Sequence, residues 1–142
     1  YIQPTLLDSI TWEDSVMQEE IFGPLLPVLS FTDFNGILCE IIKREKPLAA
    51  YLFTKNKEQK NKFLKTVSFG GGCINDTVMH LTGDSLPFGG VGNSGMGSYH
   101  GEFGFLAFSH QKAILEKSNW GETNFKYPPY SKEKLKWIKR FM

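Results

Sequence analysis

The segment at residues 85–101, SLPFGGVGNSGMGSYHG, carries six glycines in seventeen positions. Glycine loses more backbone freedom on ordering than any other residue, so this stretch cannot sustain a regular helix or strand. Loops as long as residues 76–101 inside a compact domain are usually functional or disordered. Gly90, Gly92 and Gly95 spell the G-x-G-x-x-G string of dinucleotide-binding folds. More glycines follow where that fingerprint needs a helix, so we reject this interpretation.

Upstream of this loop, short apolar runs alternate with helical patterns. Strands are expected at residues 2–10, 25–31, 48–54 and 73–75, with Pro27 favouring an edge or a bulge. A first helix is expected to begin after Asp33, a plausible N-cap, and to stop at Pro47. A second helix is expected to begin at Asn56, which forms a possible capping box with Gln59, and to run to about Val67. Its inward-facing residues are expected to be Phe63, Leu64 and Val67, and Gly70-Gly71-Gly72 is expected to end it. The order strand–helix–strand–helix–strand predicts an α/β fold built on a βαβαβ unit with parallel strands.

The remainder of the chain is expected to contain one more strand and one more helix. Residues 105–116 are typical of a strand, and residues 131–142 of a short helix capped by Ser131. That last helix carries five cations and one acid, with Leu135, Ile138 and Met142 on one face. It could lie on a membrane surface; a solvated helix that packs on its own domain or on a partner subunit is the favoured alternative.

Length and charge restrict the function classes. A chain of 142 residues is typical of one domain. Its net charge of +1 gives no basic field, which argues against a nucleic-acid partner. No run of 18 apolar residues and no signal peptide is visible, so we expect a cytoplasmic protein without a membrane-spanning helix.

Residues 17–24, MQEEIFGP, form a second informative segment. The usual role of Glu19 and Glu20 is that of a solvated acidic pair before a turn. The alternative rests on Phe22-Gly23-Pro24, which fixes the backbone and gives Glu20 a defined direction. A carboxylate can accept hydrogen bonds from both hydroxyls of a ribose, and a phenyl ring can lie against a nicotinamide.

Both segments, in this order, resemble the aldehyde dehydrogenase superfamily. The sequence of the glycine-rich segment is most similar to the class 3 or fatty-aldehyde branch of that superfamily. The resemblance also takes in residues 44–54, 71–76 and 104–114. It implies NAD- or NADP-dependent oxidation of an aldehyde to a carboxylic acid. It also implies that residues 1–103 form the C-terminal part of the catalytic domain, that residues 104–118 form an oligomerisation strand and that residues 119–142 form a C-terminal tail. Because the family is much longer and this chain begins at Tyr1, we expect a fragment.

The resemblance also implies roles for three residues. Glu20 matches the glutamate that holds the nicotinamide ribose, and Phe22 matches the phenylalanine that contacts the nicotinamide. Phe88 matches a phenylalanine that lines the pocket where aldehyde and nicotinamide meet; the alternative is a core anchor for the loop. In the family, the strand that corresponds to residues 105–116 contributes to subunit contacts, so the resemblance implies a homodimer. A non-catalytic assembly module that dimerises through this strand is the alternative function.

No catalytic residue is expected in this chain. The family uses a cysteine thiolate that attacks the aldehyde and a glutamate that activates water. Cys39 is expected to be a buried small apolar residue on a helix, and Cys73 lies in a strand. Neither occupies the family's nucleophile context. His80 and His100 lack the spacing of metal ligands, so no metal site is expected, and a hydrogen-bonded His80 and a capping Asn75 are the simpler interpretations.

Overall fold

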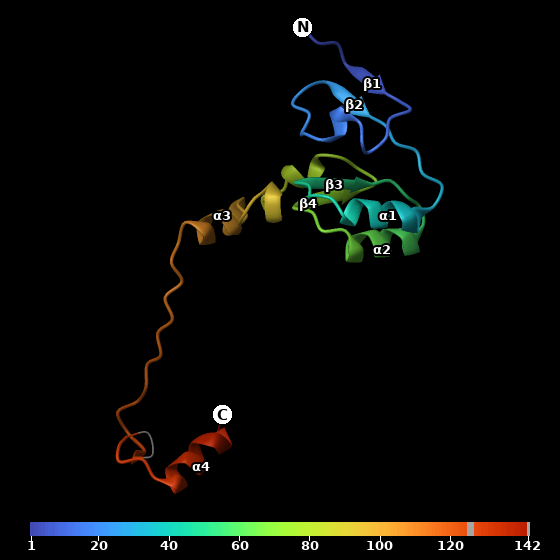
Figure 1. The fold of residues 1–142 in the computed structure, drawn as a ribbon. Coiled ribbons are helices and arrows are strands. Elements are labelled where there is room, and N and C mark those ends of the chain that lie inside the picture. The colour runs from blue at the N-terminus through green and yellow to red at the C-terminus, as the bar shows by residue number, and fades with distance from the viewer. Residues whose placement is uncertain (125–126, 142) are drawn as a thin grey trace. The chain divides into compact units, whose positions relative to one another are not determined.

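The structure is a computed structural model that describes residues 1–124 and 127–141. The chain divides into two compact units, Tyr1–Ser109 and His110–Met142. The first unit holds both sheets and the candidate site residues, and the second holds the C-terminal helix (Figure 1). Each unit is described by itself.

The first sheet pairs β1 (Thr5–Leu7) in parallel with β2 (Leu25–Pro27). Thr5 lies opposite Leu25, and Leu7 lies opposite Pro27. Within the described residues β2 pairs with β1 alone, so it is an edge strand, where a proline without a backbone N–H is tolerated. The edge position expected for Pro27 is therefore confirmed, although both strands are shorter than expected. A 3-10 turn, η1 (Ser15–Met17), lies between them.

Helix α1 (Phe34–Ile42) begins where the sequence predicts. The Asp33 carboxylate accepts hydrogen bonds from the backbone N–H of Asn35 at 3.1 Å and of Gly36 at 2.7 Å, which satisfies two of the helix's unpaired donors. Leu38 is 2% exposed and lies in the core. Cys39 is exposed, so the expectation that it is buried is wrong. One residue is about 100° of rotation around a helix, which turns Cys39 away from the face that carries Leu38.

The second sheet pairs β3 (Ala49–Leu52) in parallel with β4 (Gly71–Ile74), and α2 (Lys57–Thr66) connects them. The Asn56 side chain caps α2 as expected, by accepting from the backbone N–H of Glu58 and Gln59. The reciprocal half of the capping box is missing. The Thr54 hydroxyl instead accepts from the Asn56 backbone N–H at 3.1 Å, and it donates to the Gln59 side chain at 2.9 Å.

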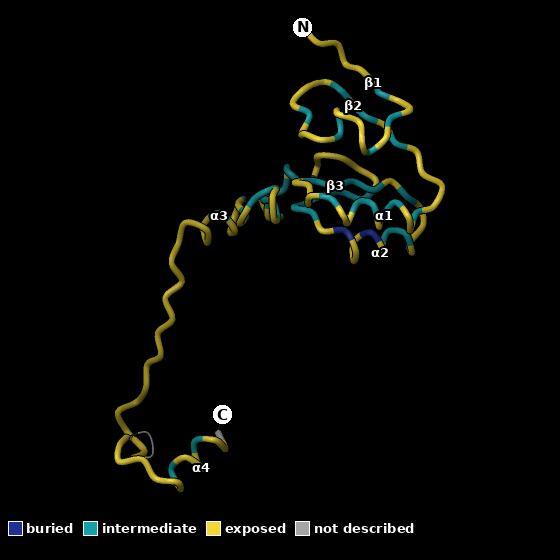
Figure 2. The backbone as a smooth tube through the Cα atoms, viewed as in Figure 1, coloured by how far each residue is buried: buried dark blue, intermediate teal, exposed yellow. Residues whose placement is uncertain are grey.

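The core of the first unit is small. Leu38 of α1, Phe63 of α2 and Val67, which follows α2, are its buried apolar residues. Figure 2 shows buried segments of the backbone in dark blue at α2. Partly buried side chains pack against them, namely Phe34, Ile41, Ala50, Leu52, Phe69 and Ile74. Leu64 is 50% exposed, so its expected inward orientation is wrong. Both helices therefore cover one face of the β3–β4 sheet.

Two expectations about the sheets need correction. The single βαβαβ unit is not found, because β2 pairs with β1 and the strands form two separate parallel sheets. The three glycines also do not end α2: the helix ends at Thr66, and Gly71 and Gly72 belong to β4. A side chain on Gly72 would overlap the carbonyl oxygen of Ala50 on the neighbouring strand, so this close strand pairing requires glycine there.

The expected strand at 105–116 is also corrected. Residues Gly101–Ala107 form helix α3, and residues 108–118 belong to neither a helix nor a strand. A helix pairs its backbone groups internally, whereas a strand needs a neighbour that the described chain does not supply here. In the second unit, α4 (Lys132–Phe141) is present as expected, and the Ser131 hydroxyl accepts from the Lys134 N–H at 3.2 Å. Met142, expected on its apolar face, lies outside the described residues.

No helix in the described ranges is both long and apolar enough to cross a membrane.

Candidate functional site

Glu20 and Phe22 lie on the loop between η1 and β2. Both are exposed, and the Phe22 side chain is 94% exposed. Preceding residues shape this loop: the Gln18 side-chain amide donates to the backbone carbonyl of Trp12 at 2.8 Å, and the Asp14 carboxylate accepts from the Thr11 N–H at 2.6 Å. Glu20 makes no hydrogen bond within the described residues. The loop therefore presents a carboxylate and a phenyl ring that the described residues leave uncovered.

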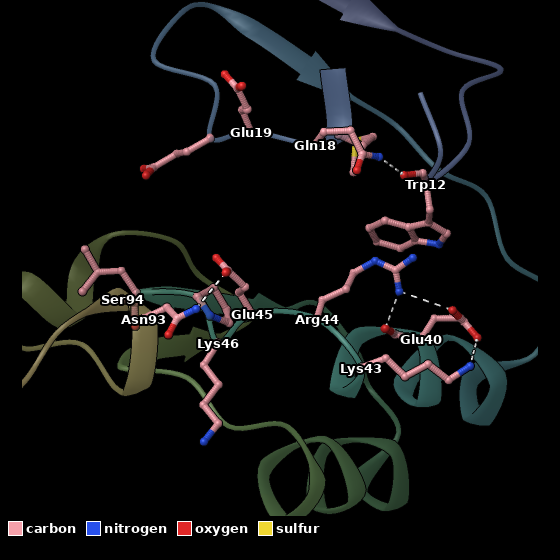
Figure 3. A pocket seen from close by; sticks show the side chains of 14 residues that line it. Trp12, Gln18, Glu19, Glu40, Lys43, Arg44, Glu45, Lys46, Asn93 and Ser94 are labelled. Atoms are coloured by element: carbon pink, nitrogen blue, oxygen red, sulfur yellow. Dashed lines mark hydrogen bonds and ion pairs between the residues drawn. The ribbon is translucent and has the colours of Figure 1, made fainter. Parts of the chain in front are cut away.

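Glu20 lines an open groove of about 960 Å3 in the first unit. Figure 3 shows the side chains that line this groove, with Trp12, Arg44 and Asn93 among those labelled. The other lining residues come from the η1 loop, the end of α1 with the segment after it, and the glycine-rich loop: Trp12, Met17, Gln18, Glu19, Glu40, Lys43, Arg44, Glu45, Lys46, Pro47, Leu48, Asn93 and Ser94. Phe22 and Phe88 are not among them. The structure therefore brings Glu20, but not the two aromatic candidates, to this groove.

Arg44 contacts both an aromatic ring and a carboxylate of the groove. Its guanidinium carbon lies 3.6 Å from the ring centroid of Trp12, a cation–π contact. The same group also donates to the carboxylate of Glu40 at 3.3 Å, and Lys43 donates to that carboxylate at 2.7 Å (Figure 3). Hydrogen bonds from Lys43 and then Arg44 favour the charged carboxylate and so lower the pKa of Glu40.

The sequence analysis missed this cluster. The i, i+4 spacing of Glu40 and Arg44 was a usable signal for an ion pair on a helix. Trp12 lies far away in the sequence, and no local pattern joins it to Arg44.

The glycine-rich loop reaches the same groove through Asn93. Its side-chain amide donates to the Glu45 carboxylate at 2.7 Å. Asn93 lies in the 3-10 turn η3 (Gly92–Ser94), whose Ser94 hydroxyl accepts from the Val91 N–H at 2.9 Å. A short turn thus occupies the middle of the G-x-G-x-x-G string, which agrees with its rejection as a dinucleotide-binding fingerprint.

Phe88 lies in an aromatic cluster and is half-buried. It forms an isolated antiparallel bridge with Tyr99, with both N–H···O distances at 2.9 Å. Its ring centroid lies 5.7 Å from that of His100, 5.5 Å from Tyr99 and 6.3 Å from His80. No described contact joins Phe88 to Glu20 or Phe22. Phe88 therefore closes the two ends of the glycine-rich loop on each other, and its role as a pocket wall stays a prediction.

Cys73 of β4 contacts a histidine. Its Sγ lies 3.6 Å from Nδ1 of His80, which is 8% exposed and lies in the 3-10 turn η2 (Met79–Leu81). The hydrogen bond expected for His80 is thus present on one ring nitrogen, while Nε2 has no partner within the described residues. The sequence analysis named both residues and missed their contact. Among the described residues no group of three or more His, Cys, Asp or Glu side chains is placed to hold a metal ion.

The exposed side chain of Asn75 joins the ends of the second sheet. Its carbonyl oxygen accepts from the Thr54 N–H at 2.7 Å, and its amide donates to the Thr54 carbonyl at 3.0 Å. In place of the expected helix or turn cap, the Asn75 side chain bonds in both directions to Thr54, which lies two residues after β3.

Comparisons with known proteins agree on one family. The sequence model described as "Aldehyde dehydrogenase family" matches residues 1–114. The "Aldehyde dehydrogenase family 3 member H1" of Arabidopsis thaliana is 52% identical over 138 residues, which are 97% of this chain and 28% of that protein. The solved structure "Substrate bound state of Staphylococcus Aureus AldH" superimposes with a TM-score of 0.89 at 49% identity, over 99% of this chain and 31% of that one.

A second solved structure is more distant. The "NAD-dependent aldehyde dehydrogenase from Sinorhizobium meliloti" has a TM-score of 0.71 at 28% identity, over 84% of this chain and 24% of that chain. The chain spans less than a third of the length of each of these relatives.

Proposed function

Since the chain belongs to the aldehyde dehydrogenase family, with family 3 members among its relatives, we propose that it forms the cofactor-facing C-terminal part of an NAD- or NADP-dependent enzyme that oxidises an aldehyde to a carboxylic acid. Glu20 holds the nicotinamide ribose, Phe22 contacts the nicotinamide, and Phe88 lines the aldehyde pocket. The observation that carries this proposal is the uncovered Glu20–Phe22 loop beside the groove.

The side chains of this loop fit a nicotinamide ribose. The Glu20 carboxylate is exposed, lines the groove and has no hydrogen-bond partner within the described residues, so its oxygens are available to two ribose hydroxyls. Phe22 offers a ring face that is 94% exposed. Bound NAD or NADP would supply the hydride acceptor. The residues of this chain would bind the ribose and set the orientation of the ring. The nucleophile and the general base would come from other parts of the enzyme.

The role of Glu20 can be tested in a chimera in which this chain replaces the matching part of the Staphylococcus aureus AldH, to which it is 49% identical. Glu20→Gln is expected to slow single-turnover hydride transfer by about 10- to 100-fold, because misorienting a reacting group costs rate. Cofactor affinity should fall less, since the ribose contact is one of many. Rapid mixing with detection of reduced nicotinamide measures both.

The matched control is Glu19→Gln. Glu19 is the neighbouring exposed carboxylate and lines the same groove, so it carries the same charge change. Its hydride-transfer rate should stay within about twofold of the unaltered chimera. Equal hydride-transfer rates for Glu20→Gln and the unaltered chimera would show that Glu20 does not hold the nicotinamide ribose.

A homodimer assembly module is the second candidate function. It is favoured by exposed apolar side chains in residues 105–116, the segment expected to make subunit contacts. Ile114 is 74% exposed and Leu115 is 94% exposed. Both lie in a stretch that has no strand partner in the described chain. A second copy could pair with this stretch by strand addition, which adds main-chain hydrogen bonds.

Sedimentation equilibrium at micromolar concentration tests this assembly. We expect a dimer, and we expect Ile114→Pro to weaken it by about tenfold or more, because proline removes an N–H and cannot join a ladder. Ile114→Val keeps the N–H and the branched side chain and should leave the dimer intact. A monomer at all concentrations would rule out the assembly role.

A further inference from the structure

Cys73 and His80 form a pair of nucleophile and base outside the groove. We propose that Cys73 is a site of covalent modification by α,β-unsaturated aldehydes, with His80 as the base that accepts the thiol proton. The inference does not depend on the proposed dehydrogenase role, because it needs only these two side chains and their surroundings.

The fold places both residues on one face of the β3–β4 sheet. Side chains alternate between the two faces of a strand. Ala50, Leu52 and Ile74 pack against the core under α1 and α2. Cys73, and Tyr51 opposite it in the register, therefore lie on the other face. His80 lies there too, with its ring centroid 5.7 Å from that of Tyr51, edge to face.

Glycine makes room for the imidazole. A Cβ on Gly71 would lie 2.9 Å from Cδ2 and 3.2 Å from Nε2 of His80, closer than ordinary packing allows. The ring therefore sits directly against the backbone of β4, with Nδ1 facing the Cys73 sulfur at 3.6 Å. A larger residue at position 71 would displace the imidazole from the sheet.

The turn that carries His80 to this place is strained. Val78 has φ of 63°, a left-handed conformation that is rare for a β-branched residue, and Asn75 has φ of 60°. Asn75 is held by its two hydrogen bonds to Thr54. Strain of this kind persists only where surrounding structure enforces it, and it is concentrated at functional sites.

The pair has the features of an activated thiol. A nucleophile within reach of a base is the recurring arrangement, and such distances are often longer in the absence of substrate. His80 is 8% exposed; its Nδ1 faces the Cys73 sulfur, and its Nε2 is buried without a described partner. Cys73 is half-buried and therefore not fully enclosed by the described chain. Cys39 is exposed but has no described contact with a histidine.

The reaction balances without an oxidant. The S–H bond of Cys73 breaks, and its proton moves to Nδ1 of His80. The sulfur lone pair forms a bond to the β-carbon of the unsaturated aldehyde, and the π electrons move to an enolate. The imidazolium then returns its proton to the α-carbon. The product is a saturated aldehyde joined to Cys73 through a thioether, and His80 is regenerated.

The test uses the 142-residue chain and crotonaldehyde, with site-resolved mass spectrometry over time. Cys73 is expected to form the adduct at least about tenfold faster than Cys39, although Cys39 is more exposed. Butanal, which lacks the double bond, should leave no stable adduct. Equal or slower modification of Cys73 relative to Cys39 in the unaltered chain overturns the proposal, and this comparison needs no variant.

Two variants separate chemistry from packing. His80→Phe keeps an aromatic ring beside Tyr51 and removes the base, so it should slow Cys73 modification by about tenfold and leave Cys39 unchanged. His100→Phe changes a half-buried histidine that stacks on Phe88 and has no described contact with a cysteine, and it should leave both rates unchanged. Circular dichroism confirms that each variant is folded. Loss of the Cys73 rate in both variants, or in neither, overturns the role of His80.

Discussion

The purified 142-residue chain is expected to reduce no NAD or NADP in the presence of aldehydes. The resemblance to aldehyde dehydrogenases implies a cysteine nucleophile and a glutamate base that precede the E-I-F-G-P stretch, and neither cysteine of this chain occupies that context. Compared with a complete relative such as the Staphylococcus aureus AldH, turnover should be lower by roughly a millionfold or more, the range by which enzymes exceed uncatalysed reactions.

The measurement is the absorbance of reduced nicotinamide over time, with the complete relative as a positive control. Cys73 gives the assay a specific control, because it is the cysteine that contacts a base. Turnover above the buffer background would contradict the prediction. Its loss in Cys73→Ala, with retention in Cys39→Ala, would then assign the nucleophile to Cys73.

Substitution of Gly72 by alanine is expected to unfold the second sheet. A Cβ at this position would overlap the carbonyl oxygen of Ala50, its register partner on β3, and would lie 3.1 Å from the carbonyl carbon. Both atoms belong to the backbone, so neither can move aside without separating the strands. Because Ala50 and Ile74 also pack against the small core, we expect a loss of about 3 kcal/mol or more in the free energy of unfolding.

Urea denaturation followed by circular dichroism measures this loss. Gly23→Ala is the matched control, since a Cβ there meets nothing within 4 Å and the backbone has no positive φ. Its free energy of unfolding should stay within about 0.5 kcal/mol of the unaltered chain. Coincident denaturation midpoints for the two variants would show that the strands have more room than this packing indicates.

The family was predictable from the sequence because its signal lies in consecutive residues. MQEEIFGP and the glycine-rich segment carried the resemblance, and the family comparison and the superposition on the Staphylococcus aureus structure confirm it. The candidate site was predictable only in part. Glu20 does lie beside a groove, but the sequence offered no indication that Trp12, Arg44 and Asn93 meet there.

The sequence by itself determined the features that depend on neighbours a few residues away. Asp33, Asn56 and Ser131 cap helices because a cap joins a side chain to an N–H two or three positions on. Tertiary structure alone decided which strands pair, that residues 105–116 find no strand partner in the described chain, and that Cys73 meets His80. The physical reason is the range of the interaction. A helix or a cap closes its hydrogen bonds locally, whereas a strand or a side-chain pair depends on a partner that only the folded chain brings within reach.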